Sequence, residues 1–282
     1  MVNTKTIGFT AAFAIVGAML LVTGCGGGGG GGGGTSFPTP TLPGDAVAFN
    51  STNAIDGADA ATGSAGILST AAAAKGTSLP FTVQDAIDLL TDQVLDRAQN
   101  SQPVATGVTT NRNCFVSGSL TETSNPTATG GSGTITFSNC NEDGISIING
   151  SFSFIATLND PLFVFNIGGN LTFTLVADGS VITMVMNLSQ TINTTTLAFT
   201  ISQTIAASGV PIGTSTVGGF LVTTIAPFEI DFVSGVISGQ MLIQGANGSQ
   251  IRITVTAPNV ATVEVDDGTG GGFVVVTTSY AL

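Results

Sequence analysis

Two pairs of acidic residues have the types and spacing for acid–base chemistry. Glu229 and Asp231, and likewise Glu264 and Asp266, alternate with apolar neighbours, so each pair shares one face of an expected strand. Side chains two residues apart on a strand are about 7 Å apart, a distance found between glycosidase carboxylates. Both pairs lie opposite the apolar face, where nothing would raise a carboxyl pKa or exclude water.

The composition removes most other catalytic arrangements. The chain has no histidine, which excludes Ser-His and Cys-His nucleophile activation and the commonest metal ligand. It also has no Trp and a single Tyr, Tyr280, so the flat aromatic platforms of a sugar site are missing. We therefore predict no enzyme activity, no catalytic residues, no cofactor and no metal requirement. A weak calcium site in residues 266–272 stays open as an alternative to a glycine-rich hairpin loop.

The charge balance limits the possible partners. Five Lys and Arg residues face 17 Asp and Glu residues, for a net charge of −12, which excludes nucleic acid as a partner. Only 8% of residues are charged whereas 43% are hydrophobic. Ser, Thr, Asn and Gly make up much of the difference, which predicts a large core beneath a neutral polar surface with the composition of a β-sheet.

Most of the chain is expected to form a β-sheet. From about Cys114 onward apolar residues recur at every second position, as where Leu171 and Phe173 alternate with Thr172. Such alternation predicts roughly ten to twelve half-buried antiparallel strands in a meander. Three dipeptides, Asn149-Gly150, Asp178-Gly179 and Asn247-Gly248, predict type I′ hairpin turns between these strands.

One amphipathic helix is expected before the sheet. Thr82 is a suitable N-cap for residues 83–99, and Asp85 can complete a capping box. The apolar positions Val83, Ala86, Ile87, Leu90, Val94 and Ala98 share one face, opposite a stripe of aspartates. The aspartates fit a solvated face or, alternatively, a cation or partner surface. The expected fold class is mainly β: a large antiparallel meander sheet, open, curled or partly closed, with this helix packed on it.

The N-terminal residues resemble those of bacterial lipoproteins. After Lys5, residues 7–22 form an apolar run that is short for a membrane span and typical of a signal peptide. The sequence Val22-Thr23-Gly24-Cys25 resembles a lipobox. The resemblance implies cleavage between Gly24 and Cys25, and attachment of acyl chains such as palmitate to Cys25. An ordinary secretory signal or a short uncleaved anchor remains the alternative.

A glycine tract follows the cysteine and predicts a spacer. Residues 26–34 are all glycine, so they have no side chain to bury and form a flexible coil with a reach of about 15–18 Å. The small, polar and Pro-containing segment after it is expected to extend this tether to residue 65. By analogy with enteric bacteria, Gly26 in place of Asp favours sorting to the outer membrane of a Gram-negative bacterium.

The other two cysteines, Cys114 and Cys140, fall in neighbouring expected strands. An exported chain is in an oxidising compartment, where such a pair predicts a disulfide.

These observations predict four segments and a noncatalytic role. The segments are a signal peptide (1–24), a lipidated cysteine and tether (25–65), a helical segment (66–112) and a β domain (113–282). The expected protein is lipid-anchored in the cell envelope, contacts the membrane through its lipid, and has a structural or interaction function with an unidentified envelope partner. The alternative is carriage of a hydrophobic ligand in a half-barrel, with Met184 and Met186 pointing inward. An outer-membrane barrel is disfavoured because the aromatic girdle of such barrels is missing.

Overall fold

The computed structural model describes residues 37–65, 108–127, 130–142, 144–159, 161–193, 195–196, 198–231 and 234–282. Cys25, the glycine tract and the helix predicted over residues 83–99 lie outside these ranges.

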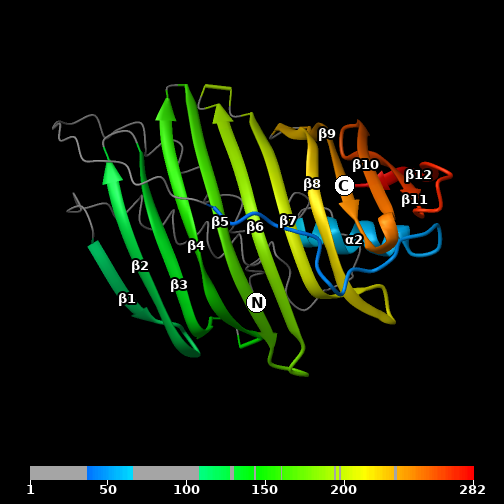
Figure 1. The fold of residues 1–282 in the computed structure, drawn as a ribbon. Helices are drawn as coiled ribbons and strands as arrows, with labels where there is room; N and C mark the ends of the chain where they lie inside the picture. Colours follow the sequence, from blue (N-terminus) through cyan, green and yellow to red (C-terminus); the bar gives the residue numbers. More distant parts are fainter. Residues whose placement is uncertain are drawn as a thin grey trace, which may run out of the picture.

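The described chain forms one antiparallel sheet in which each strand pairs with the next along the sequence (Figure 1). The sheet is open, with β1 at one edge and β12 at the other. This confirms the mainly β meander with a helix on it. The strands are β1 (Val108–Asn113), β2 (Ser117–Thr127), β3 (Gly130–Asn141), β4 (Ser146–Asn159), β5 (Leu162–Leu175), β6 (Val181–Asn193), β7 (Phe199–Ile212), β8 (Thr216–Asp231), β9 (Gly235–Gln244), β10 (Gln250–Ala257), β11 (Val260–Asp266) and β12 (Val274–Ala281).

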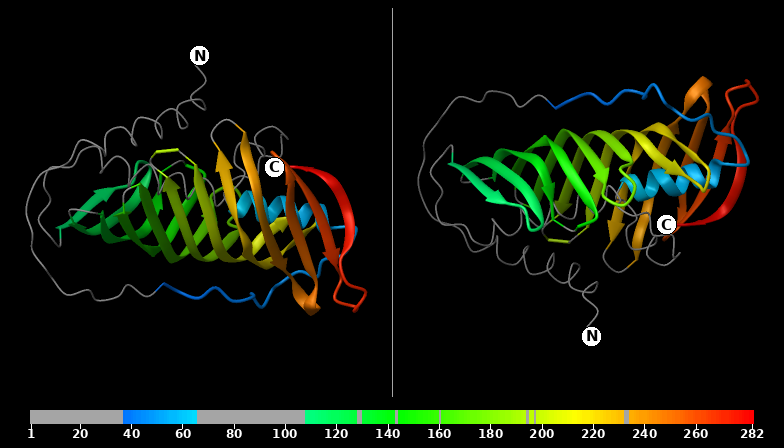
Figure 2. Two further views of the ribbon diagram at one scale, coloured as in Figure 1. Left: turned by 90° about the horizontal axis from the view of Figure 1, so that it is seen from above. Right: turned by 90° about the horizontal axis from the view of Figure 1, so that it is seen from below.

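The alternating sequence pattern sets the two faces of the sheet. In β5 and β6, Leu171 pairs with Met184 and Phe173 with Ile182, and all four side chains are buried on the inner face. Polar residues such as Thr172 occupy the intervening outward positions. The period of two therefore places the core on one side of the sheet, as predicted. Figure 2 shows that β9–β12 curl away from the plane of the preceding strands.

Of the three predicted type I′ turns, one is confirmed, one is a turn of another kind and one is wrong. Asn247-Gly248 lies between β9 and β10 with positive φ at both residues, as a type I′ turn requires. Asp178-Gly179 lies between β5 and β6, but only its glycine has a positive φ, so the chain turns there without a type I′ geometry. Asn149-Gly150 instead lies inside β4, with Gly150 paired to Phe137 and Leu171. Its φ of 111° occurs beside an irregularity in the pairing of β3 with β4, and the chain does not reverse direction there.

Residues 37–65, placed in the tether by the sequence analysis, are instead packed against the sheet. Residues 37–53, here called the strap, run along the outer face, and helix α2 (Ala54–Ala65) lies on the inner face (Figure 2). The strap is fixed at β8, where Val47 donates a backbone hydrogen bond to Gly219 and Gly219 donates one to Asp45, both at 3.0 Å. Phe49, 1% exposed, packs beside Gly57 and Gly245, where the chain passes from the outer face to the inner face.

Helix α2 is built to pack closely. Ala54, Ala58 and Ala61 are completely buried and follow a helical spacing, so they form one small-residue face. This face contacts β7, β8, β10 and β11. The helix therefore covers the inner face at the C-terminal half of the sheet.

Candidate functional site

The predicted lipid attachment residue, Cys25, lies outside the described residues. Within the described part of the chain, none of the helices has the length and apolar character needed to cross a bilayer.

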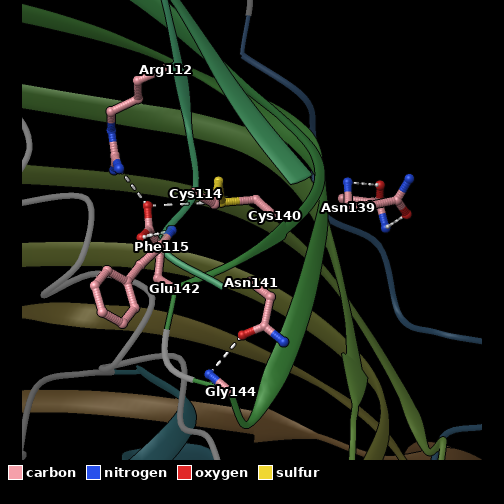
Figure 3. Close-up of a disulfide and its surroundings, with 9 residues drawn as sticks. Arg112, Cys114, Phe115, Asn139, Cys140, Asn141, Glu142 and Gly144 are labelled. Atoms are coloured by element: carbon pink, nitrogen blue, oxygen red, sulfur yellow. Dashed lines mark hydrogen bonds and ion pairs between the residues drawn. A yellow bond between two sulfur atoms is a disulfide. The ribbon is translucent and has the colours of Figure 1, made fainter. Parts of the chain in front are cut away.

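The predicted disulfide between Cys114 and Cys140 is present, with a Cα–Cα distance of 5.4 Å (Figure 3). It joins the turn after β1 to the end of β3, and both cysteines are buried. The bridge closes a sequence separation of 26 residues, which corresponds to about 3.5 kcal/mol of stabilisation in the chain-entropy account. Because both sulfurs are bonded to each other, neither is a free thiolate that could bind a metal. The cluster of Cys114, Cys140 and Glu142 is therefore not a metal site.

A set of polar contacts holds the loops beside the disulfide (Figure 3). The Glu142 carboxylate accepts the backbone N–H of Phe115 at 2.9 Å and forms an ion pair with Arg112 at 2.6 Å. In the next turn, the Asn141 side chain accepts the N–H of Gly144 at 2.6 Å. The backbone that carries Phe115 is therefore fixed on both sides.

Phe115 itself is the most conspicuous residue of this corner. Its side chain is 88% exposed although both neighbouring elements are braced. Val116 beside it is also exposed. The sequence alone does not identify this pair, because the alternation of polar and apolar residues does not predict the exposure of turn residues.

The carboxylates of both acidic pairs accept hydrogen bonds within the sheet and its turns. Glu264 accepts a 2.7 Å hydrogen bond from Arg252 Nε, and the Arg252 guanidinium lies 4.1 Å from the centre of the Phe273 ring. The hydrogen bond from Arg252 lowers the pKa of the Glu264 carboxyl, the opposite of what a general acid needs. In the other pair, Glu229 accepts the Ser238 hydroxyl and Asp231 accepts the N–H of Ser234.

The loop of residues 266–272 uses its carboxylates within the turn. Asp266 accepts the N–H of Gly268 at 2.9 Å. Asp267 accepts both the N–H and the hydroxyl of Thr269, and these hydrogen bonds lower its pKa. This is the geometry of a glycine-rich hairpin loop closed by aspartate side chains.

The inner face holds the two methionines singled out for the ligand-carrier alternative. Met184 and Met186 are each 1% exposed. A groove of about 290 Å³ lies elsewhere, between the strap residues Phe37 and Pro38 and the strands β4 and β5. Its walls include the outward side chains of Ser151, Ser153 and Asn170, so it is a polar groove.

The sheet also buries polar residues that the sequence alone did not single out, Glu122 and Gln203 among them. Glu122 in β2 and Gln203 in β7 are each 3% exposed. Among the described residues, the side-chain amide of Gln203 has no hydrogen-bond partner, whereas its backbone N–H donates to the Thr224 hydroxyl. Gln203 stands between Ile201 and Ile205 on the apolar face, and this interruption of the alternation was the available signal. The sequence around Glu122 offers no comparable signal.

A further polar contact joins α2 to the last strand. The Tyr280 hydroxyl donates to Asp59 at 2.7 Å and lies 3.1 Å from the Thr62 hydroxyl. Burial raises the pKa of Tyr280 well above its ordinary value, and the hydrogen bond to Thr62 opposes this shift. These hydrogen bonds fix the helix to β12.

No protein family, curated protein or solved structure matches this chain.

Proposed function

We propose that the chain is a lipid-anchored protein of the bacterial cell envelope with a noncatalytic structural or interaction role. The observation that carries the proposal is the lipobox-like sequence at Val22-Thr23-Gly24-Cys25 followed by nine glycines. Acyl chains on Cys25 would hold the chain stably at a membrane, and the glycines would connect them to the folded part as a flexible spacer. The expected location is the outer membrane.

The attachment of the strap supports a tethering role. Phe37, the first described residue, lies over Gly168 in the middle of β5. The following residues are hydrogen-bonded to β8 and to the β9–β10 turn, where Ala246 donates to Val47 at 2.9 Å and Phe49 donates to the Ser249 hydroxyl at 2.8 Å. A force on the tether would thus be carried by central strands of the sheet and not by a free end.

The chemistry of the acidic pairs supports a noncatalytic role. Their carboxylates accept hydrogen bonds from Arg252, Ser238 and Ser234, and the pKa of Glu264 is lowered. The expected role is therefore to display a stable sheet surface to another envelope component.

The proposal is tested by fractionating cells that express the full chain or its Cys25→Ser variant. The unchanged chain should sediment with the outer membrane and be released only by detergent. The Cys25→Ser chain should lose the detergent-dependent attachment, whereas a Cys114→Ser/Cys140→Ser chain should keep it. Equal behaviour of the Cys25→Ser and unchanged chains would contradict lipid anchoring.

The noncatalytic role and the carrier alternative need separate measurements. Purified protein should not turn over ester or glycoside substrates, and turnover that disappears in Glu264→Gln or Glu229→Gln would refute the noncatalytic role. Organic extracts of the purified protein should contain no stoichiometric lipid beyond the acyl chains on Cys25. A stoichiometric extracted lipid would instead favour carriage of a hydrophobic ligand.

A further inference from the structure

The meander places alternate turns at the same end of the sheet. The chain reverses direction at every turn, so the β1–β2, β3–β4 and β5–β6 turns lie side by side at one end of the strands (Figure 1). Backbone hydrogen bonds join these turns directly. Val116 donates to Asn141 at 2.9 Å, and Val176 donates to Ile145 at 2.8 Å.

This end carries a group of exposed apolar side chains, here called the turn rim. Its members are Phe115, Val116, Ile145, Val176 and Val181, with exposed fractions of 88%, 54%, 48%, 52% and 49%. Most surface positions of the same strands are Ser, Thr or Asn, so the rim contrasts with its surroundings. The turns that carry these residues are neighbours joined by backbone hydrogen bonds, and exposed apolar residues gathered in this way mark a surface that meets a partner.

The rim is held in a fixed position. The disulfide Cys114–Cys140, the Arg112–Glu142 ion pair and the Phe115 N–H bond to Glu142 brace the loop on which Phe115 stands. A residue that is both braced and almost fully exposed costs little conformational entropy when it contacts another surface.

We propose that the turn rim contacts the lipid surface to which the chain is anchored. This inference rests on the proposed lipid anchoring. The rim presents apolar tips from three adjacent turns, which suits a broad apolar–polar interface better than a pocket. The partner is thus a membrane interface, met at the level of the headgroups.

The length of the N-terminal segment permits this contact. Residues 26–36 lie between Cys25 and Phe37 and span at most about 38 Å when extended. Phe37 lies over Gly168, and β5 runs from there to its end at Leu175 over about 24 Å. An anchored chain can therefore bring the rim to the membrane, and its high effective concentration there makes even weak apolar contacts sufficient.

The charges near the rim specify the kind of lipid surface. Arg112 is paired with Glu142, whereas Asp178 in the β5–β6 turn is exposed, and its hydrogen bonds to Ser180 keep its pKa low. A rim with an ionised carboxylate beside it should rest among headgroups without deep insertion. It should also prefer zwitterionic to anionic lipid.

The chain contains no Trp, so a single introduced Trp can report on this contact. The full lipidated chain carrying Phe115→Trp is placed in vesicles of phosphatidylcholine with brominated acyl chains. The matched control is Leu162→Trp, a 40% exposed residue at the start of β5 and hence at the opposite end of the sheet. The emission of the Phe115→Trp chain should shift to shorter wavelength and be quenched, while that of the Leu162→Trp chain should stay unchanged.

Each other outcome overturns the inference. Unquenched emission in both chains means that the rim points away from the membrane, and equal quenching in both means that the rim is not a specific contact. Acyl modification of Cys25 is measured on the same samples by mass spectrometry. A lipidated chain without quenching refutes the rim and leaves the anchor intact, whereas an unmodified Cys25 refutes the anchor.

Discussion

Phe37 lies so close to Gly168 that a Cβ atom on the glycine would be 2.5 Å from the Phe37 Cβ atom. The first described residue of the strap therefore packs on the bare backbone of a central strand. Glycine inside a strand often marks this kind of close approach. The contact joins the predicted tether to the folded sheet.

Gly168→Ala should detach the start of the strap, because the added methyl group overlaps the Phe37 side chain. The expected loss of unfolding free energy is about 1–3 kcal/mol, as for other overpacking substitutions. Urea denaturation measures the loss, and limited proteolysis should show faster cleavage within residues 37–53.

Gly271→Ala is the matched control, since no atom lies within 4 Å of its Cβ position. The Phe37→Ala/Gly168→Ala double variant should recover part of the loss, because the two sites are in direct contact. Identical stability and cleavage in Gly168→Ala and Gly271→Ala would refute the packing role of Phe37.

Removing the disulfide should destabilise the β1–β3 corner. Cys114→Ser/Cys140→Ser is expected to lose about 3.5 kcal/mol of unfolding free energy, from the loop that the bridge closes. Urea denaturation of the unchanged chain with and without a reducing agent should show a similar difference. The same reductant should have no effect on the double variant, and a reductant-insensitive unchanged chain would contradict a structural disulfide.

The only tyrosine of the chain reports on the docking of α2 against β12. Burial raises the pKa of Tyr280 above its unfolded value of about 10, so the folded state favours the neutral phenol. The stability that this provides is complete below pH about 10 and is lost as the pH rises above it. Tyrosinate absorbance should therefore appear only as the chain unfolds in base.

Tyr280→Phe separates this effect from general alkaline denaturation. The variant should lose the hydrogen bonds to Asp59 and Thr62, at a cost of about 1 kcal/mol at neutral pH. Its stability should also fall less steeply in base. Ionisation of Tyr280 in the folded chain near its ordinary pKa would show that α2 is not docked as described.

Glu264 should contribute to stability and not to a reaction. Its pKa is lowered by the hydrogen bond from Arg252, so its contribution is present above its unfolded pKa of about 4.3 and is lost as the pH falls below that value. Glu264→Gln should lower the unfolding free energy at neutral pH by no more than about 1 kcal/mol. The variant should also show a weaker acid dependence. The matched control is Glu229→Gln, which alters a hydrogen bond to the Ser238 hydroxyl and leaves the Arg252–Glu264 ion pair in place. If stability depended on pH in the same way in both variants, the role of Arg252 would be contradicted.

The sheet could be predicted from the sequence because its signal is local. Alternation such as that of Leu171, Phe173 and the threonine between them specifies a strand and the face that it buries. The disulfide was predictable for a related reason, since the two cysteines fall in neighbouring segments of a meander. The Asn149-Gly150 prediction was wrong because a positive φ at glycine serves a strand irregularity as well as a turn.

The strap and α2 could not be predicted because their folded conformations depend on contacts with residues far away in the sequence. α2 contains Gly57 and small side chains, which give a weak local helix signal, and it is stabilised by contacts with β7, β8, β10 and β11. The strap looks like a linker by composition, and only the glycines of the sheet, Gly168 and Gly219 among them, pointed to a segment lying over them. The exposure of Phe115 likewise follows from the placement of a turn.

The most direct test of lipid anchoring is the mass of the N-terminal peptide of the protein purified from bacterial membranes. This peptide is expected to begin at Cys25 and to carry acyl chains on its thiol and its amino group. A peptide that begins at Met1, or one that contains an unmodified Cys25, would contradict lipid anchoring.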